Sequence, residues 1–584
     1  MPEESVRPLQ RGLAVLRALT LADGARAGDL ARATGLARST VDRVVATLVR
    51  LGYVRVRGQE LHLSPRLMEL GNAYLAASGL TGEVAARTAR LADELDESVS
   101  LAVPDGDGVR FVTQAARRRA MSVAFRIGDL LPPERCAPGA LFAAAWDEEQ
   151  WAAWRARVAQ GPAEDDFPAL PPGPAPKDAP DLAARVAHAR ETGRALDDQL
   201  IEPGLIAVAV PVHDTAGRVR YALSVVSHTS RHTADGLAKA MLPRLRAEAR
   251  HLEELDGREG PVPEGPERVG PERERPEREG PERERPERER PERVGPERVG
   301  PERERPVPER PSPADPVAAK AELGPEFLQS LARGLAVLRA LGEARGDGLP
   351  LTDIAAATGL PRATARRCLH TLVLEGYAAH DGRLYRPLPR ILELGHAALS
   401  RLTFAELAEP HLRALTDRVH QSASVTVLDG ADILYVARAA TVRVMSVHIT
   451  VGTRFPAYAT AMGRVLLAGL PAAERARRLA STPPRALTPR TVTDPGELAR
   501  VLERAAADGH ATADEELEEG LRSVAVPVRD AAGRVVAALN VAQHAGTAPL
   551  AETRDALLPE LRATAAAIEA DLHTAARFHH VHTP

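Results

Sequence analysis

The chain has 584 residues, long enough for about four domains, and its formal net charge of −4 means that any nucleic-acid-binding surface has to be a local basic patch. Hydrophobic residues make up 44% of the chain and can build real cores, whereas Cys136 and Cys368 lie far apart and outside any CxxC spacing, which argues against a disulfide framework and a zinc site. No apolar run approaches the roughly 18 residues of a membrane-spanning helix and the N-terminus has no signal-peptide core, so we expect a cytoplasmic protein without a metal or other cofactor.

Nearly the same sequence occurs twice in the chain. RGLAVLRALT at Arg11–Thr20 returns as RGLAVLRALG at Arg333–Gly342, and the segment Asp29–Tyr53 returns as Asp353–Tyr377. Solenoid repeats have periods of roughly 20–50 residues, so repetition on this scale indicates a duplicated set of domains. Two copies in one chain are what a fused dimer would have.

The first copy opens with the pattern of a winged helix-turn-helix, which we place at residues 6–66. Its third helix is expected after the turn glycine Gly35, with an apolar inner face and a polar, basic outer face. The inner face would hold Val41, Val44, Val45, Leu48 and Val49, and the outer face Arg38, Ser39, Asp42, Arg43 and Thr47. The alternating segment Tyr53–Leu63 would form a wing that brings Arg55 and Arg57 near phosphates.

Two further segments complete the first half of the chain. Residues 67–256 are expected to form a second domain, interrupted by a Pro-rich insertion at about residues 161–180. From residue 257 to 316 the composition falls to Pro, Glu, Arg, Gly and Val, with no hydrophobic face to offset the entropy of ordering the chain. Recurrent proline favours an extended, semi-stiff disordered linker. The alternative is an interaction tail whose arginines contact DNA, which the nearly equal number of glutamates disfavours.

The second copy repeats the winged helix-turn-helix at residues 327–390. Leu351–Thr358 is expected to be a short helix with Thr352 as its N-cap, Gly359 to supply the turn, and Pro361 to begin the third helix. The inner face of that helix would hold Ala365, Cys368, Leu369, Leu372 and Val373, and the outer face Arg362, Ala363, Arg366, Arg367 and His370.

The outer face of this third helix has small side chains near its N-terminal end and positive charge along its length, which suits it to the major groove of DNA. A hairpin over Tyr377–Arg386 would form the second wing, with Arg383 and Arg386 near phosphates. Asp42 of the first copy stands where the second has Arg366, so the first module is expected to bind DNA more weakly.

Residues 391–575 show the patterns of strands and helices in alternation. The expected strands are Ser422–Leu428, Ile433–Ala437, Ser523–Val528 and Val535–Ala542. Helical stretches are expected at Thr460–Leu470 and Pro495–Asp508.

These motifs resemble the IclR family of bacterial transcriptional regulators. The second half is the closer match, and its motifs are similar to the subgroup that controls protocatechuate and β-ketoadipate catabolism. The resemblance rests on FLQSLARGLAVLRAL, LTDIAAATGLPRATARRCLHTLVLEGY, VGTRFPAYATAMGRVLLAGLP, LTPRTVTD and DEELEEGLRSVAVPVRDAAGRVVAALNVAQH, which together cover Phe327 to about Leu572. The first half resembles the family over about Leu9–Ala143 and Thr192–Leu252.

The resemblance implies an α+β protein in which each copy has a winged helix-turn-helix followed by a GAF-like α/β effector-binding domain. It implies a regulator that binds double-stranded DNA at a palindrome-like operator and a small carboxylate effector. The residues expected to bind DNA are Arg38, Ser39, Thr40, Arg43, Arg55, Arg57, Arg362, Ala363, Thr364, Arg366, Arg367 and Arg383. The residues implied to bind the effector are Ala461, Met462, Gly463, Asp514, Ser523, Asn540 and Ala542.

The chemistry of that effector site is consistent with an anion. Thr460 can cap the helix, and the free N–H groups that follow it point toward a bound carboxylate. Ser523 and Asn540 would add hydrogen bonds, and Met462 an adaptable apolar wall. Asp514 would either accept from a ligand hydroxyl or cap a turn.

The first copy departs from this pattern. Its corresponding residues are Ala137, Pro138, Asp198, Ala207, Ser224 and Val226. Pro138 removes an amide donor, and Glu134 brings negative charge to the position of Tyr458. We expect the first pocket to bind something else or nothing, and its domain to serve mainly as the dimerisation partner of the second.

Other classes of protein are less well supported. No GxSxG, HExxH or GxxxxGK motif occurs, which argues against an enzyme. The acidic run 514–519 has no nearby histidine to complete a metal site. One alternative stays open, an effector-blind fused-dimer DNA-binding or scaffold protein with degenerate sensor domains. In either case one chain would form an intramolecular pseudo-dimer, and further self-association is left open.

Overall fold

The computed structural model describes residues 5–22, 24–80, 82–117, 125–160, 167–170, 181–258, 324–344, 348–441 and 449–578. The predicted linker at residues 257–316 lies outside them, except for its first two residues, which end a helix. The insertion at residues 161–180 is described only at residues 167–170. Within the described ranges, no helix has both the length and the apolar character to span a bilayer.

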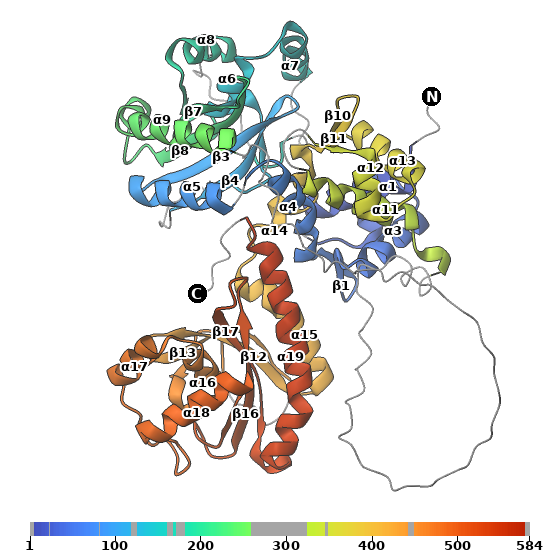
Figure 1. Cartoon of the computed structure of the whole chain (residues 1–584). Helices are drawn as coiled ribbons and strands as arrows, with labels where there is room; N and C mark the ends of the chain where they lie inside the picture. Colours follow the sequence, from blue (N-terminus) through green and yellow to red (C-terminus); the bar gives the residue numbers. More distant parts are fainter. Residues whose placement is uncertain are drawn as a thin grey trace, which may run out of the picture.

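The fold is α+β and consists of four domains, two from each copy (Figure 1). We call the winged helix-turn-helix domains reader 1 (residues 7–63) and reader 2 (residues 329–387). The domains that follow them are effector domain 1 (residues 82–258) and effector domain 2 (residues 404–575). In Figure 1 the two readers lie side by side, while the effector domains, coloured blue to green and orange to red, lie apart.

Each reader has three helices and a β-hairpin, as the sequence predicts. Reader 1 consists of α1 (Arg7–Ala22), α2 (Ala27–Thr34), α3 (Arg38–Arg50), β1 (Val54–Arg57) and β2 (Glu60–Leu63). Reader 2 consists of α11 (Gln329–Ala340), β9 (Leu349–Pro350), α12 (Leu351–Thr358), α13 (Arg362–Leu374), β10 (Ala378–His380) and β11 (Leu384–Pro387). The turn glycines Gly35 and Gly359 are left-handed, with φ of 66° and 63°, which confirms their predicted role.

Three details of the predicted helices are wrong. The N-cap of α12 is Pro350, and the Thr352 hydroxyl inside the first turn donates to the Asp353 carboxylate instead. Thr47, expected on the outer face of α3, is buried, because the second copy covers this end of the helix. Val49, expected inside, is 37% exposed, because the buried face of α3 at this end consists of Thr47 and Leu48.

The two readers pack against each other as a pseudo-symmetric pair. A Cβ added to Gly12 of α1 would overlap Leu331 of α11, and one added to Gly334 of α11 would overlap Leu9 of α1, so only glycine allows this close crossing. Two equivalent hydrogen bonds tie each N-terminal arm to the third helix of the other reader. They run from Val6 N–H to Thr371 Oγ1 at 2.8 Å and from Leu328 N–H to Thr47 Oγ1 at 2.9 Å.

The segments after the readers continue the contact between the copies. η2 (Pro65–Leu67) and α4 (Met68–Ala77) follow reader 1, and η6 (Pro389–Glu393) and α14 (His396–Leu399) follow reader 2. A Cβ on Gly71 of α4 would overlap the His396 ring of α14. The four domains therefore share a continuous core that includes residues of both copies.

Effector domain 1 is built on a six-stranded antiparallel sheet in the order β5-β4-β3-β8-β7-β6. Its strands are β3 (Ser98–Asp105), β4 (Gly108–Ala115), β5 (Leu130–Leu131), β6 (Ala195–Asp198), β7 (Leu205–His213) and β8 (Val219–His228). Its helices are α5 (Gly82–Leu95), α6 (Ala137–Ala143), α7 (Glu148–Gln160), α8 (Leu182–Thr192) and α9 (Ala234–Arg258). α5 and α9 cover one face of the sheet, and α6 packs on the other.

Effector domain 2 repeats this architecture, with the sheet order β14-β13-β12-β17-β16-β15. Its strands are β12 (Ser422–Asp429), β13 (Asp432–Ala439), β14 (Arg454–Pro456), β15 (Ala511–Asp514), β16 (Leu521–Arg529) and β17 (Val535–His544). Its helices are α15 (Phe404–Val419), α16 (Ala461–Ala468), α17 (Ala472–Ser481), α18 (Pro495–Asp508) and α19 (Leu550–Ala575). α15 and α19 pack on one face, and α16, with α18 against it, packs on the other.

Candidate functional site

The third helix of reader 2 presents a cationic surface. Arg362, Arg366 and Arg367 of α13 are exposed, as is the small Ala363, while Thr364 is half-buried. Within the part of the chain that the structure describes, none of these three arginines takes part in an ion pair of 4 Å or less. Their charge is therefore available to phosphates or to the base edges of a major groove.

The third helix of reader 1 carries less available charge. Arg38 Nε donates to Asp42 Oδ1 at 2.9 Å, an ion pair within one turn of α3. Ser39 and Arg43 are exposed, and Thr40 is half-buried. Asp42, which replaces an arginine of the second copy, thus neutralises one arginine predicted to bind DNA.

The two wings also differ. In reader 2 the Asp381 carboxylate accepts from the N–H groups of Leu384 and Arg383, which holds the turn and lowers the pKa of Asp381. Arg383 and Arg386 are exposed at this hairpin. In reader 1 Arg57 is exposed, but Arg55 reaches away from the wing to Asp571 of effector domain 2. Five arginines of reader 2 that are predicted to lie near DNA thus remain exposed, and so does Arg57 of the first wing.

The candidate ligand site of effector domain 2 lies where α16 begins, over one face of the sheet. Thr460 caps α16 by accepting from Gly463 N–H at 3.0 Å, as the sequence predicts for a capping residue. Ala461 and Met462, the first two residues of the helix, are buried. The first turn of a helix directs N–H groups outward and favours an anion.

Pairing across the sheet brings the strand residues of the predicted site together. Ser523 lies opposite Ala513 and Ala542, and Asn540 opposite Ala525 and Ser424. Since alternate residues of a strand share a face, Ser523, Asn540 and Ala542 all face α16. The adjacent Ala525 and Ala538 belong to the core beneath α16, which confirms the direction.

Two buried oxygen atoms on this face have no hydrogen-bond partner among the described residues. They are Asn540 Oδ1 and Thr426 Oγ1, from neighbouring strands β17 and β12. Buried polar atoms are normally paired, so these two are free to meet a ligand or water. Thr426 was not predicted, although the alternation Ser422, Ser424, Thr426 along β12 was a signal for a polar face.

Asp514 does not join these residues. It follows Ala513 on β15 and therefore points to the other side of the strand. Its carboxylate accepts from Arg522 Nε at 2.6 Å and from Arg490 Nη1 at 3.1 Å. The structure thus gives Asp514 an ion-pairing role at the edge of the sheet and separates it from the ligand face.

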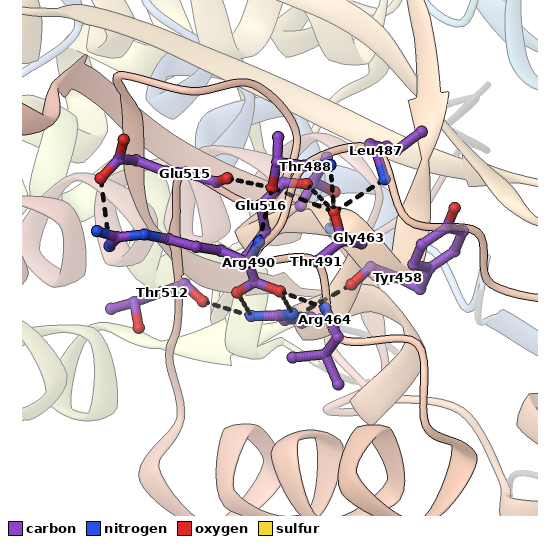
Figure 2. Close-up of polar contacts among 12 residues, drawn as sticks. Tyr458, Gly463, Arg464, Leu487, Thr488, Arg490, Thr491, Thr512, Glu515 and Glu516 are labelled. Atoms are coloured by element: carbon purple, nitrogen blue, oxygen red, sulfur yellow. Dashed lines mark hydrogen bonds and ion pairs between the residues drawn. The ribbon is translucent and has the colours of Figure 1, made fainter.

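An ion pair that sequence reasoning missed supports the start of α16 (Figure 2). Both terminal nitrogens of Arg464 donate to the Glu516 carboxylate, and Arg464 also donates to the carbonyls of Tyr458 and Thr512. Figure 2 also shows Thr488 and Thr491 bound to the backbone beside this ion pair. Thr488 Oγ1 donates to the carbonyl oxygen of Glu515, and Thr491 Oγ1 donates to that of Glu516, each at 2.7 Å. The acidic run of the sequence is therefore largely paired with arginines.

Effector domain 1 has different polar groups at the equivalent place. Asp197 takes the position of Ala513 and is fully buried; its Oδ1 accepts from Leu200 N–H at 2.7 Å, while its Oδ2 has no partner among the described residues. Burial, offset only in part by this hydrogen bond and by the charge of Arg185, raises the pKa of Asp197 to about 7. Ser224, the counterpart of Asn540, also has a buried oxygen without a partner in the described part of the chain.

Glu134, the residue expected to bring negative charge to the first site, is neutralised. Arg157 donates two hydrogen bonds to its carboxylate, at 2.8 and 3.0 Å, and Trp154 Nε1 donates a third at 3.0 Å. Burial tends to raise the pKa of Glu134, but the hydrogen bonds and charge of Arg157 outweigh it and lower that pKa. Asp197, by contrast, keeps one carboxylate oxygen without a hydrogen-bond partner among the described residues.

Comparison with known proteins agrees with this architecture. The IclR helix-turn-helix domain model matches residues 8–58 and 330–382, and the model described as bacterial transcriptional regulator IclR C-terminal matches residues 72–254 and 396–570. The Pca regulon regulatory protein of Pseudomonas putida is 47% identical over 240 residues, covering 41% of this chain and 82% of that protein. The p-hydroxybenzoate hydroxylase transcriptional activator of Acinetobacter baylyi is 33% identical over 245 residues, covering 41% of this chain and 90% of that protein.

A similar solved structure covers less than half of this chain. A transcriptional regulator from Rhodococcus sp. RHA1 is 50% identical, with a TM-score of 0.40, and the match covers 43% of this chain and all of that one. The similar proteins are transcriptional regulators rather than enzymes. Each half of the chain thus has the two domains of one such regulator, and the chain belongs to the IclR family of DNA-binding transcriptional regulators as a tandem duplication.

Proposed function

We propose that this regulator reads one operator with a single chain and responds to a small carboxylate of aromatic-acid catabolism. The observation that carries the ligand proposal is the start of α16 lying over the unpaired oxygens of Asn540 and Thr426. Helix N–H groups suit the carboxylate, and the two oxygens suit ring hydroxyls, which can donate to them. A hydroxylated aromatic acid such as protocatechuate presents both kinds of group.

The relatives support the same class of ligand. One similar protein is named as the regulator of a Pca regulon, and another as the transcriptional activator of p-hydroxybenzoate hydroxylase. The site residues Ala461, Met462, Gly463, Ser523, Asn540 and Ala542 would hold the effector. Asp514 would influence effector binding only indirectly, through its ion pairs with Arg522 and Arg490.

For DNA, the pseudo-symmetric pair of readers would occupy two half-sites of a palindrome-like operator. Because α3 and α13 carry different side chains, the half-sites should differ in sequence. Arg38, Ser39, Thr40 and Arg43 would read one half-site, and Arg362, Ala363, Thr364 and Arg367 the other. Such a regulator would work in the cytoplasm, and its four domains in one chain would leave self-association unnecessary for operator binding.

Footprinting of the full chain on the DNA upstream of its own coding sequence, with and without protocatechuate, tests this proposal. Two protected half-sites of unequal sequence, altered by the ligand, are the expected result. Protection that no concentration of protocatechuate alters would keep the operator proposal and contradict the proposed effector. No protection at low salt would contradict the operator proposal itself.

A further inference from the structure

The wing of reader 1 is bound to the effector domain of the other copy. Arg55 Nη2 donates to Asp571 Oδ2 on α19 and lies 3.3 Å from His411 Nε2 on α15. His411 Nε2 is in turn 2.8 Å from the same Asp571 oxygen. The three side chains, which we call the latch cluster, are 25%, 11% and 18% exposed for Arg55, Asp571 and His411. The charge of Arg55 is thus neutralised in a mostly buried contact.

A second bond fixes the same surfaces together. Asn72 Nδ2 on α4 donates to the carbonyl oxygen of Thr574 at 2.8 Å, three residues beyond Asp571 on α19. α19 also packs against η2, which directly follows the wing of reader 1. The last turns of α19 therefore hold the wing and the segment that follows it.

The latch cluster exists for one reader only. The residues at the corresponding positions of the other copy are Ala379 for Arg55, Arg87 for His411 and Leu255 for Asp571. Arg87 is engaged elsewhere, because its Nε donates to Glu248 Oε1 at 2.7 Å. Pseudo-symmetry therefore does not require the contact, and it is a property of these particular side chains.

The helix that carries Asp571 covers the back of the ligand face. Leu561 and Ile568 of α19 share a core with Val524 and Val541, which lie on β16 and β17. On the same two strands, Ser523 and Asn540 face α16. A shift of these strands on the ligand side would therefore be transmitted to α19, because close-packed protein interiors transmit strain.

The electrostatics favour a closed cluster. Burial tends to raise the pKa of Asp571, but the hydrogen bond from His411 and the charge of Arg55 outweigh it and lower that pKa. Asp571 is therefore a carboxylate at neutral pH. Removing this carboxylate would leave Arg55 without its counter-charge in the contact and return a net positive charge to the wing.

We propose that the latch cluster lets effector domain 2 withhold a phosphate-binding charge from reader 1. The inference rests on the proposed operator function. Arg55 and Arg57 stand two residues apart on β1 and so share one face of the wing, yet only Arg57 is exposed. When α19 moves away, Arg55 becomes free to contact the DNA backbone beside Arg57. Regulation thus crosses between the copies, from the second ligand domain to the first reader.

The test is a footprint titration of each half-site with the full chain. Asp571→Asn keeps the shape of the side chain and removes its charge, and we expect it to tighten the half-site of reader 1 about fivefold. The slope of log affinity against log salt should steepen by roughly one for that half-site, because one more phosphate is neutralised. The half-site of reader 2, identified by its loss in Arg362→Ala, should keep its affinity.

Two matched comparisons complete the test. Glu560→Gln breaks the 2.6 Å ion pair of Glu560 with Arg418, which joins the same two helices without touching reader 1, and should leave both half-sites unchanged. In the otherwise wild-type chain, Arg57→Ala should weaken the half-site of reader 1 severalfold, whereas Arg55→Ala should not. This second pair needs no change in effector domain 2 and so does not depend on the folding of Asp571→Asn.

The outcomes separate the latch from the proposed function. If Asp571→Asn leaves the half-site of reader 1 unchanged or weakens it, or if Arg55→Ala weakens it as much as Arg57→Ala, the latch is refuted while operator binding stands. If the wild-type chain protects no DNA, the proposed function fails, and the latch with it.

Discussion

The two effector domains share one sheet order but anchor the turn after their edge strand with different chemistry. In effector domain 2 the buried pair of Arg464 and Glu516 ties this turn to α16. In effector domain 1 these positions are Ala140 and Leu200, and Arg135 instead donates to the carbonyl oxygens of Leu200 and Ile201. In both domains an arginine thus holds this turn, but it binds a carboxylate in effector domain 2 and backbone carbonyl oxygens in effector domain 1. The charges beside the two ligand faces differ as a result.

The largest effect is expected from breaking the ion pair of effector domain 2. Glu516→Gln removes the carboxylate and leaves the Arg464 guanidinium buried without its counter-charge, which costs about 3–5 kcal/mol of unfolding free energy. Calorimetry or hydrogen exchange at β15 and β16 would measure the loss. Glu515→Gln is the control, since Glu515 pairs with the largely exposed Arg490 and should cost about 1 kcal/mol or less. Equal losses in the two variants would contradict a special role for the buried pair.

The next effect comes from the buried acid of effector domain 1. The folded pKa of Asp197 is about 7, above its ordinary value of 3.8, so the unfolded chain loses this proton first as pH rises. Stability of the domain should therefore fall between about pH 4 and pH 7 and level off above. Asp197→Asn keeps the acceptor for Leu200 N–H and should stabilise the domain by up to about 4 kcal/mol at pH 8, because the pKa shift of about 3 units is worth 1.36 kcal/mol per unit.

Tryptophan fluorescence is a selective probe for that measurement, because all three tryptophans, Trp146, Trp151 and Trp154, lie in effector domain 1. Glu191→Gln, at an exposed position of the same domain, should leave the pH profile unchanged. A wild-type profile that is flat from pH 4 to pH 7 would show that Asp197 is not perturbed.

The readers can be compared in the same way. Replacing Arg362 and Arg367 together by Ala should weaken the half-site of reader 2 by on the order of a hundredfold, because each arginine at a base or phosphate contributes about 1–3 kcal/mol. The matched change of Arg38 and Arg43 should weaken the half-site of reader 1 less, since Arg38 is already paired with Asp42. Unchanged affinity in the first variant, measured by footprint titration, would contradict the assignment of α13.

Local signals in the sequence predicted many of the elements. The helices expected at Leu351–Thr358 and Pro495–Asp508 have those bounds in the structure, because each ends at a left-handed glycine, Gly359 or Gly509, and α18 begins at a proline after a capping aspartate. The strand pairs were predicted to within about two residues at each end, because alternation and turn residues mark them.

Contacts between distant segments could not be predicted in this way. Asp514 is next to Ala513, which lies on the ligand face, and successive side chains of a strand point to opposite faces of the sheet. Thr47 is buried by Leu328 of the other copy, and Arg55 is held by Asp571, which is 516 positions away. Each depends on how domains dock, and no local pattern encodes the docking. The family resemblance identified the ligand face, but the chain's own packing decided which predicted residues reach it.

The smallest effect, and the sharpest comparison of the two ligand faces, concerns protocatechuate. Titration calorimetry of the wild-type chain should give one bound ligand per chain, because Pro138 and Asp197 make the first site unfavourable for a carboxylate. Asn540→Leu keeps the volume of the side chain and removes both its donor and its acceptor, so affinity should fall about tenfold, the value of one or two hydrogen bonds. Ser224→Ala, at the equivalent position of effector domain 1, should leave the affinity and the stoichiometry as they are. Two ligands per chain, or equal losses in the two variants, would mean that the first copy has kept the specificity of the second.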